Sequence, residues 1–224
     1  MINGIVRHVE GVWRLPDHGL WELRGKRRHY VYSKVSAWVA IDRYVRRREE
    51  DGSQADAKLR RMRKLRQQMH DEICREGYDP GLGTFVEYFG AGSLDASLLL
   101  LPLLGFLPIG DGRISRTIDA IERELMTDGL VHRRHPHHHA QQGAFLACNC
   151  WLAECMIMQG RREAARKTFE RVLEAANDLG LLAEEYDIRT KRLAGNFPQA
   201  LSHLALVRTA LRFSGQITQR GDTP

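Results

Sequence analysis

Cysteine and proline are scarce in this sequence, which has four cysteines and seven prolines in 224 residues. Four cysteines in a chain of this length do not make a disulfide framework. The longest apolar run, Leu98 to Leu107, covers about half a membrane span and is broken by Pro102 and Gly105. The first residues, MINGIVRHVE, lack the apolar region of a secretory signal. We therefore expect a soluble, cytoplasmic protein with no membrane segment.

Neither sign of charge dominates, because 34 Lys and Arg residues face 28 Asp and Glu residues, for a net charge of +6. This mildly basic balance permits acidic partners but does not demand nucleic acid, so we expect no nucleic-acid partner. The hydrophobic fraction of 43% is enough for a packed core. Composition alone therefore indicates a globular protein of one or two domains and no particular function.

Helical periodicity is abundant in the sequence, whereas the long alternation of apolar and polar residues typical of strands is missing. Apolar residues three or four positions apart form a stripe over 59–73 and a second one over 114–125. A last helix is expected from Pro198 to about Phe213, with the proline in its first turn. The other predicted helices cover 33–49, 145–158 and a segment from Ala165 that ends before Gly180, a candidate C-cap. The fold class is therefore all-α, with roughly seven or eight helices joined by long polar loops.

One of these loops carries a carboxyl group beside an indole. It has the sequence DHGLWELRG and contains Trp21, Glu22 and Arg24. A carboxyl group held against an indole is desolvated and stays protonated at higher pH, which suits a general acid. The alternative is a tryptophan that plugs the core beside a solvated Glu22, and these residues alone favour that alternative.

A second loop carries three carboxylates within four positions, Glu184, Glu185 and Asp187. Crowded carboxylates shift one another's pKa values, a property of acid/base sites. A solvated acidic loop is the plainer interpretation of this loop taken alone. The two loops together are more informative, because inverting glycosidases need two carboxyl groups roughly 6.5–9.5 Å apart, one acting as acid and one as base.

The sequence resembles glycoside hydrolase family 15, in its bacterial trehalase/glucoamylase-like branch. Six segments carry the resemblance, in the order of the family and from about Gly11 to Leu211. They are GLWELRGKRRHYVYSKVSAWVAIDR, LDASLLLLPLLGFLP, TIDAIERELMTDGLV, GAFLACNCWLAE, ANDLGLLAEEYD and GNFPQALSHLALVRTAL.

The resemblance implies an all-α fold, the (α/α)6 toroid of six-hairpin glycosidases, and hydrolysis of α-glucosidic bonds with inversion. It assigns the general acid to Glu22 and the general base to Glu184. It also places Trp21, Arg24 and Asp95 on segments that line the substrate pocket. It implies no metal and no organic cofactor.

Two departures from the family pattern change these expectations. Seven or eight helices cannot close a toroid of twelve, so residues 1–213 are expected to be the C-terminal portion of a catalytic domain, incomplete at its N-terminal side, with a frayed tail over 214–224. Helices that lack their partners would expose apolar surface and favour self-association. In the segment HRRHPHHHAQQGAF, Arg133 matches an arginine of the family. Arg134 stands where relatives have tyrosine and Gln142 where they have glutamate, which puts substrate contacts of this loop in doubt.

Several features have plainer interpretations. The histidine cluster over 132–139 lacks the fixed spacing of a structural zinc site, and the basic stretch 58–66 suits a solvated helix face better than a nucleic-acid surface. The three cysteines Cys148, Cys150 and Cys155 suit apolar packing. The competing functions are an inert, solenoid-like helical binding module and a folded but inactive fragment. The sequence does not separate trehalose from α-1,4-linked glucosides as substrate.

Overall fold

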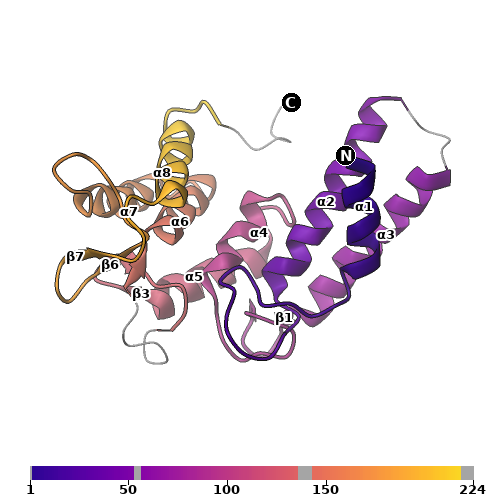
Figure 1. Cartoon of the computed structure of the whole chain (residues 1–224), viewed down its shortest axis with the longest axis horizontal. Coiled ribbons are helices and arrows are strands. Elements are labelled where there is room, and N and C mark those ends of the chain that lie inside the picture. Colours follow the sequence, from indigo (N-terminus) through magenta and orange to yellow (C-terminus); the bar gives the residue numbers. More distant parts are fainter. Residues whose placement is uncertain (1, 53–56, 136–142, 218–224) are drawn as a thin grey trace. The chain divides into compact units, whose positions relative to one another are not determined.

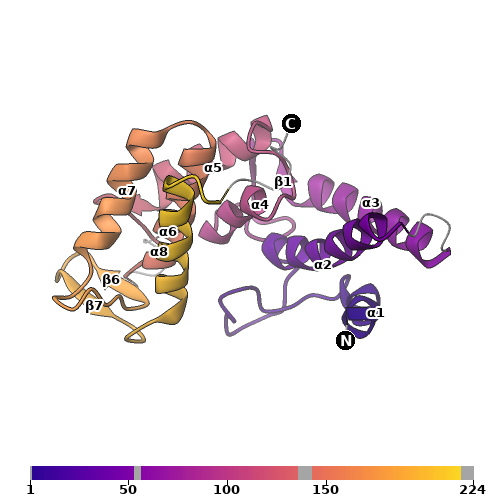
Figure 2. The same ribbon diagram turned by 90° about the horizontal axis from the view of Figure 1, so that it is seen from above.

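A computed structural model describes residues 2–52, 57–135 and 143–217 of the chain. The chain divides into two compact units, Met1–Gly92 and Ser93–Pro224 (Figure 1, Figure 2). Helices dominate both units, and the strands in the described segments are only two or three residues long. The predicted mainly helical chain is therefore confirmed. None of the helices in these segments is long and apolar enough to cross a membrane.

The first unit is built on three helices, α1 (Ile2–Val12), α2 (Val31–Glu50) and α3 (Ala57–Glu76). A short antiparallel ladder of β1 (Tyr78–Asp79) and β2 (Thr84–Phe85) follows them. Helix α2 packs against both α1 and α3. The predicted stripe of α3 is buried along its whole length, at Leu59, Met62, Leu65, Met69 and Ile73. This part of the sequence prediction is confirmed.

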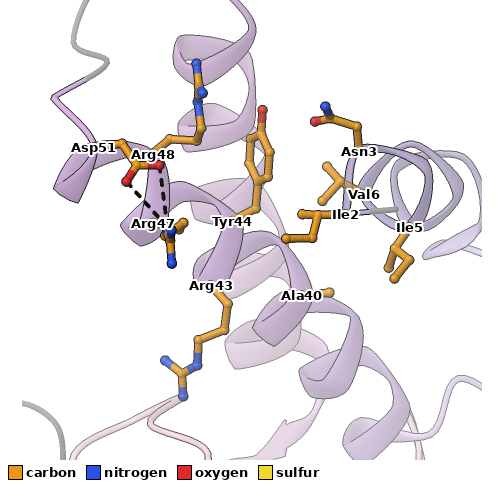
Figure 3. A pocket seen from close by; sticks show the side chains of 10 residues that line it. All are labelled: Ile2, Asn3, Ile5, Val6, Ala40, Arg43, Tyr44, Arg47, Arg48 and Asp51. Atoms are coloured by element: carbon orange, nitrogen blue, oxygen red, sulfur yellow. Dashed lines mark hydrogen bonds and ion pairs between the residues drawn. The ribbon is translucent and has the colours of Figure 1, made fainter.

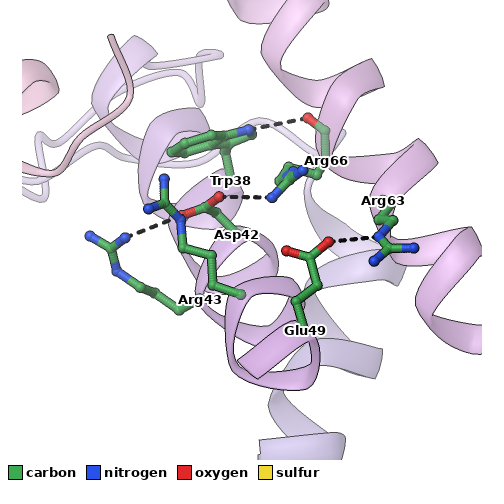
Figure 4. Close-up of polar contacts among 7 residues, drawn as sticks. Trp38, Asp42, Arg43, Glu49, Arg63 and Arg66 are labelled. Atoms are coloured by element: carbon green, nitrogen blue, oxygen red, sulfur yellow. Dashed lines mark hydrogen bonds and ion pairs between the residues drawn. The ribbon is translucent and has the colours of Figure 1, made fainter. Parts of the chain in front are cut away.

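Polar contacts fix α2 against α3 (Figure 4). The buried carboxylate of Asp42 accepts hydrogen bonds from Arg46 Nε at 2.8 Å, Arg43 Nη1 at 3.2 Å and, across the helix pair, Arg66 Nη1 at 3.3 Å. Trp38 Nε1 donates to the carbonyl oxygen of Arg66 at 3.1 Å. A buried carboxylate needs such partners because desolvation penalises an unpaired charge heavily. The basic side chains of 58–66 thus include one that holds this helix pair together.

The helices expected from the sequence do not include the N-terminus, whereas the structure has α1 there. Val6 is its one buried residue, and two glycines lower its intrinsic helix propensity. Packing against α2 stabilises it instead. A groove of about 510 Å³ lies between the two helices, where Ile2 and Val6 point toward Tyr44 (Figure 3). Tertiary contact with α2 therefore outweighs weak local propensity in α1.

The elements of the second unit, in chain order, are η1 (Ala96–Leu99), α4 (Leu100–Leu103), α5 (Gly112–Leu125), β3 (Met126–Thr127), β4 (Leu130–Val131), β5 (Ala144–Phe145), α6 (Leu146–Met158), α7 (Arg162–Glu174), β6 (Glu185–Asp187), β7 (Arg192–Ala194) and α8 (Ala200–Phe213). The buried helix α6 lies at the centre of this unit and packs against α4, α7 and α8. The strands β5, β6 and β7 form one antiparallel sheet, and β3 pairs with β4.

Helix α6 is buried on nearly all sides, as its apolar sequence predicts. Its cysteines Cys148, Cys150 and Cys155 are buried and free, so their interpretation as packing residues is confirmed. Burial raises the pKa of the Cys150 thiol to about 12. The helix also carries a fully buried carboxylate, Glu154, whose Oε2 accepts from Arg208 Nε at 3.1 Å and Arg212 Nε at 2.9 Å. These two bonds tie α6 to α8 by a charge pair inside the core.

One predicted helix cap and one predicted helix start are wrong, although α7 does end before Gly180 as expected. Helix α7 ends at Glu174 and is capped by Ala175, not by Gly180. The glycine belongs instead to a turn in which Asn177 Oδ1 accepts the backbone N–H of Leu181 at 2.8 Å. Helix α8 begins at Ala200 rather than at Pro198, because Gln199 is extended and caps the helix with its side chain. A side-chain hydrogen bond thus sets the start of α8, whereas backbone bonds from Ala175 close the end of α7.

Candidate active site

The loop that carries Glu22 connects α1 to α2 and is closed by hydrogen bonds near its base. Asp17 and Arg28 exchange both backbone hydrogen bonds, at 2.9 and 2.8 Å. The Nζ of Lys34, a buried residue of α2, donates to the carbonyl oxygens of Trp13 and Leu15, both at 2.6 Å. Burial lowers the pKa of Lys34, and the charges of Asp17 and another carboxylate oppose that shift. The loop is therefore closed between Asp17 and Arg28, and the residues at its start are held by α2.

At the tip of this loop, Glu22 has a left-handed backbone, with φ of 47°. Such a conformation is uncommon for a residue other than glycine and is often found at functional sites. The side chain of Glu22 is exposed, whereas Trp21 is half-buried. Glu22 and Arg24 both line a hollow of about 580 Å³. The remaining lining residues are Asp17, His18, Gly19, Leu23 and Ser33.

The second predicted carboxylate, Glu184, comes directly before β6. Its Oε2 accepts hydrogen bonds from the side-chain Nδ2 of Asn196 at 2.8 Å and from the backbone N–H of the same residue at 3.2 Å. Its Oε1 lies 3.9 Å from Nη1 of Arg133. These donors hold the carboxylate of Glu184 in one orientation. Asn196 is missing from the sequence-based site, although it lies in the segment GNFPQALSH that carries part of the resemblance.

A glycine makes room for this carboxylate. Gly195 has φ of 74°, and a Cβ built on it would lie 3.1 Å from Glu184 Oε2. Gly195 could therefore gain a side chain only by displacing Glu184. Close approach of backbone to a functional group is a common reason for glycine at such a position.

The neighbouring carboxylate, Glu185, turns away from solvent. Its Oε1 pairs with Nη2 of Arg133, and its Oε2 accepts the backbone N–H of Gly143 at 3.1 Å. Burial raises the pKa of Glu185, while Arg133 opposes the shift and Glu184 adds a smaller increase. The pKa of Asp187 is lowered by hydrogen bonds from Thr190 in the hairpin turn. The expected crowding of carboxylates thus makes a small contribution to the raised pKa of Glu185, for which burial is the larger cause. Hydrogen bonds are the main cause of the lowered pKa of Asp187.

Asp95 has a local structural role that the resemblance does not imply. It is the N-cap of η1, where its Oδ1 accepts the backbone N–H of Ser97 at 2.7 Å. The residue is buried and forms a backbone bridge with Arg134. Capping satisfies a helix N–H that has no partner within the helix. Asp95 therefore joins the start of η1 to the segment that carries Arg133.

The histidine-rich loop lies mostly outside the described residues, which include His132 and His135 but not His137, His138, His139 or Gln142. Among the residues that the structure does describe, no three His, Cys, Asp or Glu side chains are grouped as a metal site requires.

Comparison with known proteins gives a consistent result. The model of the family described as glycosyl hydrolases family 15 matches residues 1–211. A trehalase of Thermoplasma acidophilum is 37% identical over 222 residues, which is 98% of this chain and 38% of that protein. A trehalase of Mycobacterium tuberculosis is 39% identical over 204 residues, which is 89% of this chain and 30% of that protein. The chain thus spans well under half the length of these relatives.

Solved structures share the fold. The glucoamylase from Saccharomycopsis fibuligera superposes with a TM-score of 0.76 at 12% identity, over 94% of this chain and 60% of that one. A glycosidase variant in complex with glucose gives a TM-score of 0.78 at 17% identity, over 95% of this chain and 59% of that one. The predicted six-hairpin-glycosidase-like fold class and the family resemblance are both confirmed. The chain belongs to the glycosyl hydrolases family 15.

Proposed function

We propose that this chain provides the catalytic carboxylates of an inverting glycosidase that hydrolyses trehalose. The observation that carries the proposal is the arrangement at Glu184, whose carboxylate is oriented by Asn196 and faces Arg133. The left-handed backbone of Glu22 beside a hollow supports a role for that residue as well. Similarity to proteins named trehalase, at 37% and 39% identity, favours trehalose over α-1,4-linked glucosides.

In the proposed reaction Glu22 acts as general acid and Glu184 as general base. Glu22 gives its proton to the glycosidic oxygen while the bond from C1 to that oxygen breaks. Glu184 takes a proton from a water molecule whose oxygen forms the new bond to C1 on the opposite face of the sugar. The products are two glucose molecules, one of which has inverted configuration at C1.

Three further residues are proposed to contact the sugar or to shape its pocket. Trp21 precedes Glu22 in the sequence and offers a flat apolar surface, and Arg24 offers a cation on the hollow that Glu22 lines. Asp95 caps η1 beside the segment of Arg133, so its proposed contribution runs through the placement of that segment. Residues 1–213 are proposed to be the C-terminal portion of the catalytic domain, and 214–224 a tail.

Glucose release from trehalose and from maltose tests the proposal. The full 224-residue chain is compared with Glu22→Gln, Glu184→Gln and the surface control Glu50→Gln. Loss of release by several orders of magnitude in both site variants, but not in the control, is the expected outcome. Near-native turnover in either site variant would overturn that assignment. A folded chain that releases no glucose would overturn the activity of the chain by itself and would favour the inactive-fragment alternative. Family membership already disfavours the solenoid-like module.

A further inference from the structure

A single carboxylate sits at the base of the loop that carries Glu22. Asp17 Oδ1 accepts the backbone N–H of Gly19 at 2.6 Å and the hydroxyl of Ser33 at 2.9 Å. Ser33 belongs to the first turn of α2, so this oxygen links the loop to a helix. The backbone of Asp17 also pairs in both directions with Arg28 at the other end of the loop. Asp17 thus joins three separate points of the chain.

The hydrogen bonds that start at Asp17 lead to Glu22. Gly19, held by Asp17, accepts the backbone N–H of Glu22 at 3.3 Å. His18 accepts the N–H of Leu23 through its carbonyl oxygen at 3.1 Å, and its Nδ1 lies 3.1 Å from the Leu23 carbonyl oxygen. A left-handed backbone at a residue such as Glu22 costs free energy and persists only where its surroundings determine it fully. Bonds on both sides of Glu22 provide that determination.

Gly19 adds a steric limit to the same arrangement. Its φ is 72°, and a Cβ built there would lie 3.0 Å from the ring of Tyr30. The loop therefore turns tightly against a buried ring at the point where Asp17 holds it. Asp17 Oδ1 accepts hydrogen bonds from both the Gly19 N–H and the Ser33 hydroxyl, so it fixes the turn at Gly19 to the first turn of α2.

We propose that Asp17 is the positioning residue of Glu22. Its Oδ1 sets the loop so that the carboxyl group of Glu22 meets the glycosidic oxygen. The inference rests on the proposed function, in which Glu22 is the general acid. Asp17, Ser33 and Glu22 line the same hollow, and displacement of Asp17 reaches Glu22 through Gly19, whose carbonyl oxygen accepts the Glu22 N–H.

The chemistry of the leaving group separates positioning of an acid from general damage. Hydrolysis of trehalose expels a sugar oxygen that must receive a proton from Glu22. In α-D-glucosyl fluoride the C1–F bond breaks and fluoride leaves as an anion without a proton, while water bonds to C1 and gives its proton to the base. A misplaced acid therefore slows trehalose hydrolysis far more than hydrolysis of the fluoride.

The test uses the full chain with Asp17→Ala, Asp17→Asn and Ser33→Ala. The matched control is Asp79→Ala, because Asp79 Oδ1 likewise accepts two backbone N–H groups, from Gly81 at 2.7 Å and Leu82 at 3.1 Å. We expect Asp17→Ala to lower kcat/KM for trehalose about 100-fold, the scale of a misplacement of about 1 Å. With the fluoride as substrate, kcat/KM should fall only about tenfold or less. Asp17→Asn should restore most of the rate, because Asn keeps an oxygen acceptor, and Ser33→Ala should show a weaker form of the same split.

Glu22→Gln serves as the reference for the split, by which we mean a larger loss of kcat/KM with trehalose than with the fluoride. If Glu22→Gln shows no split, the proposed role of Glu22 fails. If it shows the split and Asp17→Ala loses both activities equally, the inference about Asp17 fails while the proposed function stands. A second readout needs no turnover: the three-bond coupling between the amide and Hα protons of Glu22, measured by NMR, reports its φ. It should change in Asp17→Ala and not in Asp79→Ala, and an unchanged coupling in Asp17→Ala would also overturn the inference.

Discussion

Two adjacent carboxylates, Glu184 and Glu185, have different surroundings and therefore different uses. Successive residues of an extended chain point to opposite sides. Glu184 is half-buried and is held by Asn196, whereas Glu185 turns inward to Arg133 and the backbone of Gly143. The first keeps part of its surface open to solvent, and the second fixes the arginine beside it. Arg133 thus connects a candidate catalytic group to a structural one.

The space next to Glu184 predicts an effect of Gly195→Ala. The matched control is Gly160→Ala, because Gly160 has a similar φ of 77° and no neighbour within 4 Å of an added Cβ. Both variants should lose about 1 kcal/mol of unfolding free energy, since alanine is strained at positive φ. Only Gly195→Ala should also lower kcat, by roughly tenfold, because the methyl group displaces the carboxylate. Urea denaturation and steady-state rates measure both quantities, and equal rates in the two variants would contradict the steric argument.

The raised pKa of Glu185 predicts a pH dependence of stability. The folded chain keeps this proton at pH values where the unfolded chain, with a pKa near the usual 4.5, has lost it. The contribution of Glu185 to the free energy of unfolding therefore falls as the pH rises from 4.5 through the raised value. In Glu185→Gln this fall should disappear from the curve of unfolding free energy against pH. Glu174→Gln, on the exposed end of α7, should retain the wild-type slope, and an unchanged slope in Glu185→Gln would refute the assignment.

At the scale of elements, the pair α6 and α8 depends on an internal charge. Glu154 is 0% exposed, and its partner Arg212 is buried as well. Removal of one member of such a pair leaves the other charge buried without compensation. We expect Glu154→Ala to cost about 3–5 kcal/mol of unfolding free energy. Glu170→Ala removes an exposed pair with Arg166 on α7 and should cost far less, because solvent screens exposed charges. Chemical denaturation of both variants tests the difference, and similar losses would show that the buried pair contributes little.

The elements that sequence predicts well are those with a complete apolar pattern. The stripe on α3 is buried at every expected position, and α6 is buried all round. Helix α1 is absent from the predicted helices and leaves most of its apolar residues exposed, and the start of α8 depends on a side-chain bond of Gln199. Periodicity reports one face of a helix, whereas caps and packing partners arise from residues elsewhere.

Prediction of the candidate active site has the same limit as prediction of the helices, because partners from elsewhere in the chain are not visible in the sequence. Glu184 stands out in sequence because three carboxylates are crowded there, and the resemblance to family 15 names it together with Glu22. Asn196 and Asp17 do not stand out, because an amide or a lone carboxylate in a loop has many ordinary roles. Only the folded chain shows that Asn196 bonds to Glu184 and that Asp17 bonds to Ser33. Residues that act through another residue are recognised from geometry.

At the scale of the whole molecule, exposed apolar side chains predict self-association. On α8, Leu204 is 69% and Val207 54% exposed, three positions apart on one face. Sedimentation velocity over a range of protein concentrations should show association that the double substitution Leu204→Glu and Val207→Glu reduces. Leu179→Glu is the matched control, because Leu179 is 76% exposed but lies in a turn rather than on a helix face. Concentration-independent sedimentation of the wild-type chain would contradict the prediction.

The loop that carries Glu22 has a consequence for protein engineering. Its closing bonds, from the Lys34 ammonium to the carbonyl oxygens of Trp13 and Leu15 and from the Ser33 hydroxyl to the carboxylate of Asp17, fall within residues 13–34. The backbone of His29 and Val31 also pairs with Phe89 and Glu87, so an exchange of this segment between related enzymes keeps its turn intact only if residues 87–89 are exchanged with it. Chimaeras that divide the segment would break these closing hydrogen bonds, so recombination points are best placed before Trp13 and after Lys34.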